Sequence, residues 1–191
     1  MDNEKQLIKK AKAGDIDSFE ILISQSKSKA FNIAMRYLNN QEDAMDAVQE
    51  SYIKVFKGLN SFRENSSFDT WVYRIIINTC NDFVRKNAKH KEDTNIYYDD
   101  GEQIEELANM VDNNSQPENI LIRHESVKFL LSCLGKLPGD QKEVIILRDL
   151  QNFSYDEIAE MLECSEGTVK SRIHRGRNAL RLMLQNNMEL L

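Results

Sequence analysis

Hydrophobic residues recur along most of this chain every three or four positions, the spacing that places them on one face of an α-helix. In the first forty residues the pattern predicts three short helices: one over 5–13, one that follows a cap at Asp15 or Asp17, and one that begins near Ser28. Gly14 and the asparagines at 39 and 40 supply the breaks between and after them. We interpret these helices as scaffold.

The next apolar stripe predicts a longer helix within residues 40–62. Its expected buried set is Ala44, Ala47, Val48, Ile53, Val55, Phe56 and Leu59. A polar loop over 63–67 then leads into a helix in which aromatic and aliphatic residues alternate with cations. Rings stack on unpaired bases and cations pair with phosphates, so this mixture fits single-stranded nucleic acid. The alternative, which we favour for the rings of Phe68 and Trp71, is that they belong to the core.

Periodicity fades over residues 90–119, which are acidic and rich in asparagine, apart from a short helical pattern at 102–110. This composition is typical of a flexible linker. Apolar stripes resume after Pro117 and again over 141–150, on either side of the turn at Pro138 and Gly139. With only two prolines and seven glycines in the chain, the sequence predicts an all-α fold with two helical domains.

The stretch 153–181 reads as a helix-turn-helix. Ser154 and Glu157 form a capping box ahead of a short support helix, and the pattern restarts after Ser165. The second helix places Val169, Ile173, Gly176 and Leu180 on its inner face. It contains five cations and no acid between Val169 and Arg181, which suits a helix that enters the major groove of DNA. A solvated basic face is the alternative interpretation.

Charge and composition disfavour several classes of function. The net charge of −6 disfavours a protein that grips DNA by bulk charge alone, so something else must supply most of the affinity. The three cysteines and three histidines match no metal-ligand spacing, and we expect reduced, buried thiols, no metal and no cofactor. The polar N-terminus and the lack of a long apolar run predict a cytoplasmic chain without membrane insertion.

Acidic and amide residues crowd the first turns of the helix within 40–62. They are Glu42, Asp43, Asp46, Gln49 and Glu50. Carboxylates near a helix N-terminus complement the helix dipole, so this cluster by itself does not establish a partner surface.

Three blocks in this order resemble bacterial RNA polymerase sigma factors of the extracytoplasmic function (ECF) group. They are NQEDAMDAVQESYIKVFKGLNSF, SSFDTWVYRIIINTCNDFVR and LPGDQKEVIILRDLQNFSYDEIAEMLECSEGTVKSRIHRGRNALR. The resemblance implies a sigma-2 domain over 1–88, an acidic linker over 89–119 and a sigma-4 domain over 120–191. It also implies a dissociable specificity subunit that directs core RNA polymerase to promoters, and no catalytic activity of its own.

The resemblance assigns three sets of residues. Contacts to the beta-prime clamp helices of the core fall to Asp43, Asp46, Gln49 and Glu50. Capture of a flipped base and melted strand at the minus-ten element falls to Phe62, Arg63, Asn65, Ser66, Trp71, Arg74, Asn78, Arg85 and Lys86. Reading of the minus-thirty-five duplex falls to Thr168, Lys170, Ser171, Arg172, His174, Arg175 and Arg177. Among these, Asn78 keeps a purely structural alternative, and Arg172 and Arg177 keep phosphate contact as an alternative.

Further partners implied by the resemblance are the beta flap of the polymerase and an anti-sigma factor, which in such families is often held at the membrane and controls a stress regulon. The chain departs from many relatives at Glu163, where they have glycine in the helix-turn-helix turn, so we expect a small backbone strain there. Val72 stands where housekeeping sigma factors have a second tryptophan, which implies weaker melting and stricter promoters.

Two rival functions differ in class. A helix-turn-helix regulator would bind duplex DNA without polymerase and would need no single-strand pocket. A metal-dependent nucleic-acid enzyme would need converging acids, and the acids here are scattered over helix starts and the acidic stretch.

Overall fold

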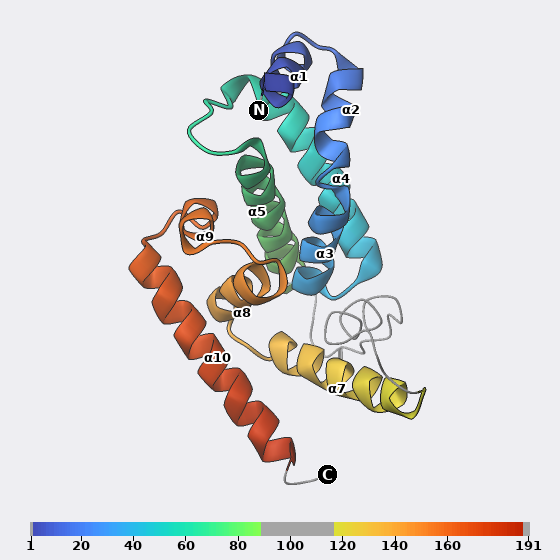
Figure 1. Cartoon of the computed structure of the whole chain (residues 1–191), viewed down its shortest axis with the longest axis vertical. Helices are drawn as coiled ribbons and strands as arrows, with labels where there is room; N and C mark the ends of the chain where they lie inside the picture. Colours follow the sequence, from blue (N-terminus) through green and yellow to red (C-terminus); the bar gives the residue numbers. More distant parts are fainter. Residues whose placement is uncertain (1, 89–116, 189–191) are drawn as a thin grey trace. The chain divides into compact units, whose positions relative to one another are not determined.

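The computed structural model describes residues 2–88 and 117–188, and every regular element in these ranges is a helix (Figure 1). The first range contains α1 (Asp2–Lys12), α2 (Ile16–Ser24), α3 (Lys27–Leu38), α4 (Gln41–Gly58), the 3-10 turn η1 (Leu59–Ser61) and α5 (Phe68–Ala88). The second contains α7 (Pro117–Gly135), α8 (Gly139–Ile145), the π-helical turn η2 (Ile146–Leu150), α9 (Tyr155–Met161) and α10 (Glu166–Met188). The all-α prediction is confirmed.

The described residues fall into two compact units. One comprises 2–88 together with 146–170, and the other comprises 117–145 together with 171–188. The predicted acidic linker lies outside the described residues from 89 to 116, so the domain boundaries stay a prediction. None of the described helices is both long enough and apolar enough to span a bilayer.

Short polar signals set the helix ends in the first unit. Gly14 adopts φ +95°, a conformation that only glycine takes without strain, and it ends α1. Asp15 then caps α2 by accepting a hydrogen bond from the amide of Ser18 at 3.2 Å. Asn39 ends α3 in the left-handed conformation, and the side chain of Asn40 caps α4. The breaks expected from the sequence are therefore where the chain turns.

The core of the first unit forms where α5 packs on α3 and α4, as Figure 1 shows for the green and cyan helices. Val72, Ile76 and Ile77 of α5 are fully buried, as are Ile33 of α3 and Val55 of α4. Each such side chain contributes about 1.5–3 kcal/mol relative to exposure in water. This burial fixes α5 and the loop before it on the α3–α4 pair.

The expected buried set of α4 is wrong at two positions. Ile53 is 54% exposed and Phe56 is 44% exposed. The helix buries Ala44, Ala47, Ser51 and Val55, which share one face at intervals of three and four residues, and Ile53 falls on the opposite face. Apolar residues therefore lie on two opposite faces of α4, and the fold buries only one of these faces.

Cysteine burial follows the prediction only in part. Cys80 and Cys133 are buried free thiols, whereas Cys164 is partly exposed in the turn between α9 and α10. No disulfide links these three residues, all of which lie in the described ranges.

The second unit holds α10 close to α8 at Gly176. A Cβ atom on Gly176 would lie 3.0 Å from Cγ1 and 3.3 Å from Cδ1 of Ile145, which is itself buried. The inward positions predicted for α10 are confirmed at Val169, Ile173 and Gly176, which are buried, while Leu180 is half-buried. Glycine at 176 is thus a packing requirement in the middle of a helix.

We expect Gly176→Val to destabilise the protein by about 1–3 kcal/mol, because the added methyl groups overpack the contact with Ile145. The matched control is Gly167→Val, also in α10, where a Cβ atom would meet only Ser165 Oγ at 3.7 Å. Thermal unfolding followed by circular dichroism measures both. Equal midpoints for the two variants would contradict the close approach at Gly176.

Candidate functional site

The acidic residues of α4 divide into two groups with different surroundings. Asp43 accepts a hydrogen bond from Asn87 Nδ2 of α5 at 2.9 Å. Glu50 pairs with Lys54 at 2.8 Å, and the same ammonium group donates to Thr79 Oγ1 of α5 at 3.1 Å. Asp43 and Glu50 therefore take part in joining α4 to α5.

Asp46 and Gln49 lie on a different side of α4. Both are exposed, and their positions flank Ile53 on the helix face that the core leaves open. Within the set of four predicted polymerase contacts, these two side chains are the ones turned toward solvent beside apolar surface.

That apolar surface is a shallow groove of about 380 Å³ between α2 and α4. It is lined by Ile16, Phe19, Glu20, Ile23, Tyr52, Ile53, Phe56 and Lys57. The rings of Phe19 and Phe56 meet edge to face, with centroids 5.0 Å apart, which fixes the groove floor. The groove was not predicted from the sequence, because Ile53 and Phe56 were expected in the core. The available signal was that both residues lie far around the helix from Ala44 and Ala47.

The predicted minus-ten residues at the start of α5 form an aromatic cluster. Phe62 is only 5% exposed, and its ring lies 5.7 Å from that of Phe68 and 5.1 Å from that of Trp71. Phe68 is buried, as expected, whereas Trp71 is half-buried and lies over Gly58. Phe62 therefore anchors the loop, and Trp71 remains partly exposed.

The rest of the loop projects outward. Arg63 and Asn65 are exposed and Ser66 is half-exposed. Glu64 between them takes φ +55°, a left-handed conformation that costs a non-glycine residue about 1–2 kcal/mol. Ser67 ends the loop by capping α5, since its Oγ accepts from the amide of Thr70 at 3.1 Å. The loop thus has a strained tip between two fixed ends.

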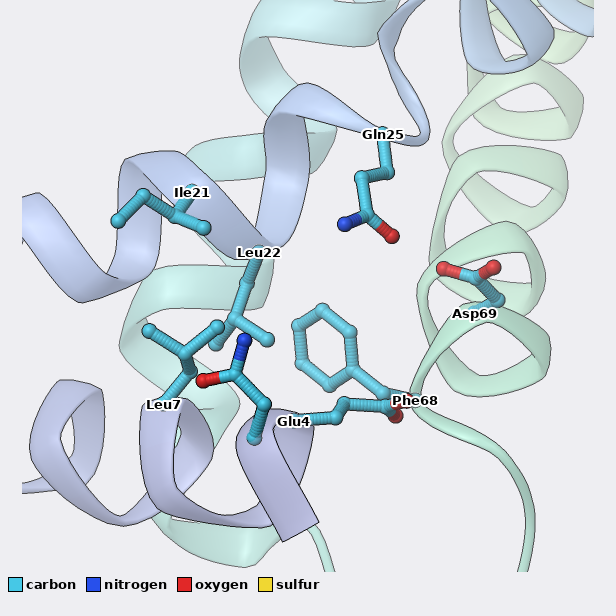
Figure 2. Close-up of a pocket in the computed structure, with 8 residues that line it drawn as sticks. Glu4, Leu7, Ile21, Leu22, Gln25, Phe68 and Asp69 are labelled. Atoms are coloured by element: carbon cyan, nitrogen blue, oxygen red, sulfur yellow. The ribbon is translucent and has the colours of Figure 1, made fainter. Parts of the chain in front are cut away.

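Phe68 also lines a small pocket between α1, α2 and α5 (Figure 2). In this view its ring points toward Leu22 and Leu7, while Gln25 and Asp69 face the pocket from its other side. Burial raises the pKa of Asp69 above its usual range, and the nearby Lys29 ammonium partly offsets that shift. Burial also raises the pKa of Tyr73 on the next turn, with Asp69 adding to the effect.

The remaining predicted minus-ten residues spread along α5. Asn78 is exposed, roughly 15 Å along the helix axis from Phe68. Arg74 forms an ion pair with Glu163, and Arg85 forms one with Asp82. Lys86 lies 5.4 Å from the centroid of the Phe83 ring. The structure thus brings Phe62, Trp71 and the loop together, but it places Asn78, Arg85 and Lys86 further along the same helix.

The helix-turn-helix has the predicted local structure. Both hydrogen bonds of the capping box between Ser154 and Glu157 are present at the start of α9. Glu163 in the turn adopts φ +50°, which agrees with the strain expected at this non-glycine residue. Ser165 then caps α10 through the amide of Thr168 at 3.1 Å.

The predicted minus-thirty-five residues are mostly, but not all, on the outer face of α10. Lys170, Ser171, His174, Arg175 and Arg177 are exposed, and Thr168 is half-buried. Arg172 turns inward instead, with its Nε 3.5 Å from Asp140 Oδ2 of α8. Contact of Arg172 with DNA stays a prediction.

Neighbouring groups hold several of the outer side chains in place. Lys170 pairs with Glu166 at 2.5 Å, and this pairing raises the pKa of the lysine. His174 Nε2 lies 2.9 Å from Asn178 Nδ2, and Arg175 Nε donates to the carbonyl of Ser171 at 3.4 Å. Arg175 is thus exposed, and the guanidinium nitrogen that bonds the backbone carbonyl is its Nε.

Comparison with known families matches both halves of the chain. The family profile of Sigma-70 region 2 matches residues 22–90, and that of Sigma-70, region 4 matches residues 130–180. The two profiles cover the α4–α5 surfaces and the helix-turn-helix described above, in the same order as the predicted domains.

A curated relative aligns almost end to end. The ECF RNA polymerase sigma-E factor of Haemophilus influenzae is 33% identical to this chain over 188 residues, which are 98% of this chain and 96% of the relative.

Two solved structures share the fold. CnrH in complex with the cytosolic domain of CnrY gives a TM-score of 0.70 at 23% identity, covering 97% of this chain and 99% of that chain. The sigma factor RpoE in complex with the anti-sigma factor NepR from Bartonella quintana gives 0.62 at 23% identity, covering 87% and 96%. Both regions match in order and a curated relative aligns over nearly its whole length, so the chain belongs to the ECF group of sigma-70 family RNA polymerase sigma factors.

Proposed function

We propose that the chain is a dissociable subunit that binds core RNA polymerase, directs it to a minus-thirty-five and a minus-ten element, and leaves the chemistry to the core. The observation that carries this proposal is the match to an ECF sigma factor over 98% of the chain. The exposed cationic face of α10 and the aromatic loop before α5 support it, because they offer one surface for duplex DNA and another for unpaired bases.

Regulation by an anti-sigma factor is part of this proposal. The structural relative RpoE is bound to an anti-sigma factor, and the open groove between α2 and α4 is apolar surface of the kind that such a partner or the core would cover. The site of action is the cytoplasm, where the core polymerase is found. A stress regulon under this control would follow from the same family membership.

The polymerase surface that we propose combines the groove with the two exposed polar residues beside it. Exposed Ile53 and Phe56 offer apolar area to a helical partner, and Asp46 offers a carboxylate for a charge-assisted bond to arginine. Clamp helices of the beta-prime subunit are the expected occupant. Asp43 and Glu50 contribute by holding α4 against α5.

In vitro transcription tests the proposal as a whole. The purified chain is added to sigma-free bacterial core polymerase on a promoter library, and start sites are sequenced. We expect specific initiation that depends on the chain. Tight duplex binding by the chain alone, with no initiation by the cognate core, would favour the helix-turn-helix regulator instead.

We expect Asp46→Lys to weaken binding to core polymerase by roughly 30-fold or more, about 2 kcal/mol, because it replaces an attraction by a repulsion at the interface. Asp17→Lys is the matched control, since it makes the same charge change at an exposed position of α2 outside the groove lining. Fluorescence anisotropy with labelled chain measures both affinities. Unchanged affinity for the Asp46 variant would rule out its assignment.

Arg175→Ala should weaken the free energy of promoter binding by about 1–3 kcal/mol and relax the preference at one base pair upstream. The reason is that the proposed pair of hydrogen bonds from the guanidinium to a guanine would be lost. Sequencing of selected promoters gives the preference at each position. Arg177→Ala serves for comparison and should weaken all sequences alike, as loss of a phosphate contact does. If Arg175→Ala also weakened all sequences equally, the arginine would be a phosphate contact.

A further inference from the structure

Helix α1 contacts Phe62, the first residue of the loop 62–67. This helix lies outside the match to region 2, which begins at residue 22. Lys12, in the last turn of α1, donates from Nζ to the backbone carbonyl of Phe62 at 2.8 Å. The same ammonium group lies 5.6 Å from the centroid of the Phe62 ring. A residue fifty positions away in the sequence therefore holds the first residue of the loop through both its backbone and its ring.

The other end of the loop, Phe68, faces a pocket that α1 also lines. Figure 2 shows the ring of Phe68 directed toward Leu7 of α1 and Leu22 of α2. Phe62 and Phe68 meet edge to face at an interplanar angle of 80°. The two ends of the loop are thus joined to each other by their rings, and Phe62 is in contact with α1 through Lys12.

The exposed tip depends on these anchors for its position. Arg63, Asn65 and Ser66 follow Phe62 directly, and the backbone between them passes through the left-handed conformation at Glu64. A tip of this kind holds its shape only when the surrounding structure fixes its ends. The charge-assisted bond from Lys12 is about twice as strong as a neutral hydrogen bond, and it acts on the residue from which the tip starts.

We propose that Lys12 is a positioning residue for the loop 62–67, and that it sets base selectivity at the minus-ten element by holding the carbonyl of Phe62. This inference rests on the proposed function, because it concerns the loop that would receive the flipped base. Lys12 touches the loop and acts on the base through it. Without the hydrogen bond from Lys12 to Phe62, residues 63–66 take several positions, and the loop then accepts more than one base.

The experiment compares three variants of the full chain in core-dependent transcription on a library randomised at the minus-ten element. Lys12→Met removes the donor and keeps the apolar stem, while Lys12→Arg keeps a cationic donor. Lys10→Met is the matched control, since it removes the same charge from an exposed lysine of α1. One base position carries about fivefold to a hundredfold discrimination. We expect Lys12→Met to reduce this discrimination by about fivefold, Lys12→Arg to retain most of it and Lys10→Met to leave it unchanged.

Two results would overturn the inference. One is a base profile of Lys12→Met equal to that of Lys10→Met. The other is a uniform loss of initiation on every sequence, which would make Lys12 a phosphate contact. A purely structural effect is recognised by a lowered thermal midpoint together with weaker core binding, neither of which we expect.

Hydrogen exchange separates this inference from the proposed function. Absence of core-dependent initiation by the unmodified chain would defeat the proposed function itself. Exchange of the loop amides in the free chain still tests the tie from Lys12, and we expect Lys12→Met, but not Lys10→Met, to speed exchange at residues 62–67. Equal exchange in the two variants would overturn the tie.

Discussion

Burial of one face of α5 against α3 and α4 is the constraint on which the N-terminal unit depends. Val72, Ile76 and Cys80 are fully enclosed, so the axis of α5 is fixed and the loop before it starts from a fixed point. The aromatic cluster around Trp71 sits at that end of the helix, where packing ends and solvent begins. A rigid helix thus presents a short loop that is fixed at both ends, and a binding site on such a loop is well positioned.

The same packing determines what α4 offers to a partner. Its buried face consists of Val55 and three small residues, Ala44, Ala47 and Ser51, and the small side chains let α4 lie close to its neighbours. The large apolar side chains Ile53 and Phe56 are left on the outside, where they do not contribute to the core. Apolar area that folding leaves exposed is available to an interface, and here it adjoins the polar residues that the family resemblance assigns to polymerase contact.

Local signals in the sequence predicted the helix ends and the helix-turn-helix, because a cap or a glycine acts within a few residues. The Ser154 capping box, Gly14 and the inward position of Gly176 are examples. Contacts between distant residues were not predictable in this way. Lys12 is one of several lysines in α1, and only the fold brings it to Phe62. Arg172 and Arg175 look alike in sequence, and only the fold pairs Arg172 with Asp140 on α8.

Charge pairing on the helix-turn-helix bears on how a chain of net charge −6 can bind promoters. Of the five cations between Val169 and Arg181, Lys170 is paired with Glu166 and Arg172 with Asp140. Affinity for bulk DNA falls as fewer positive charges are available to neutralise phosphates. We therefore expect the free chain to bind nonspecific DNA weakly. Binding to the core polymerase would then supply the missing affinity, so that promoter recognition takes place only in the assembled enzyme.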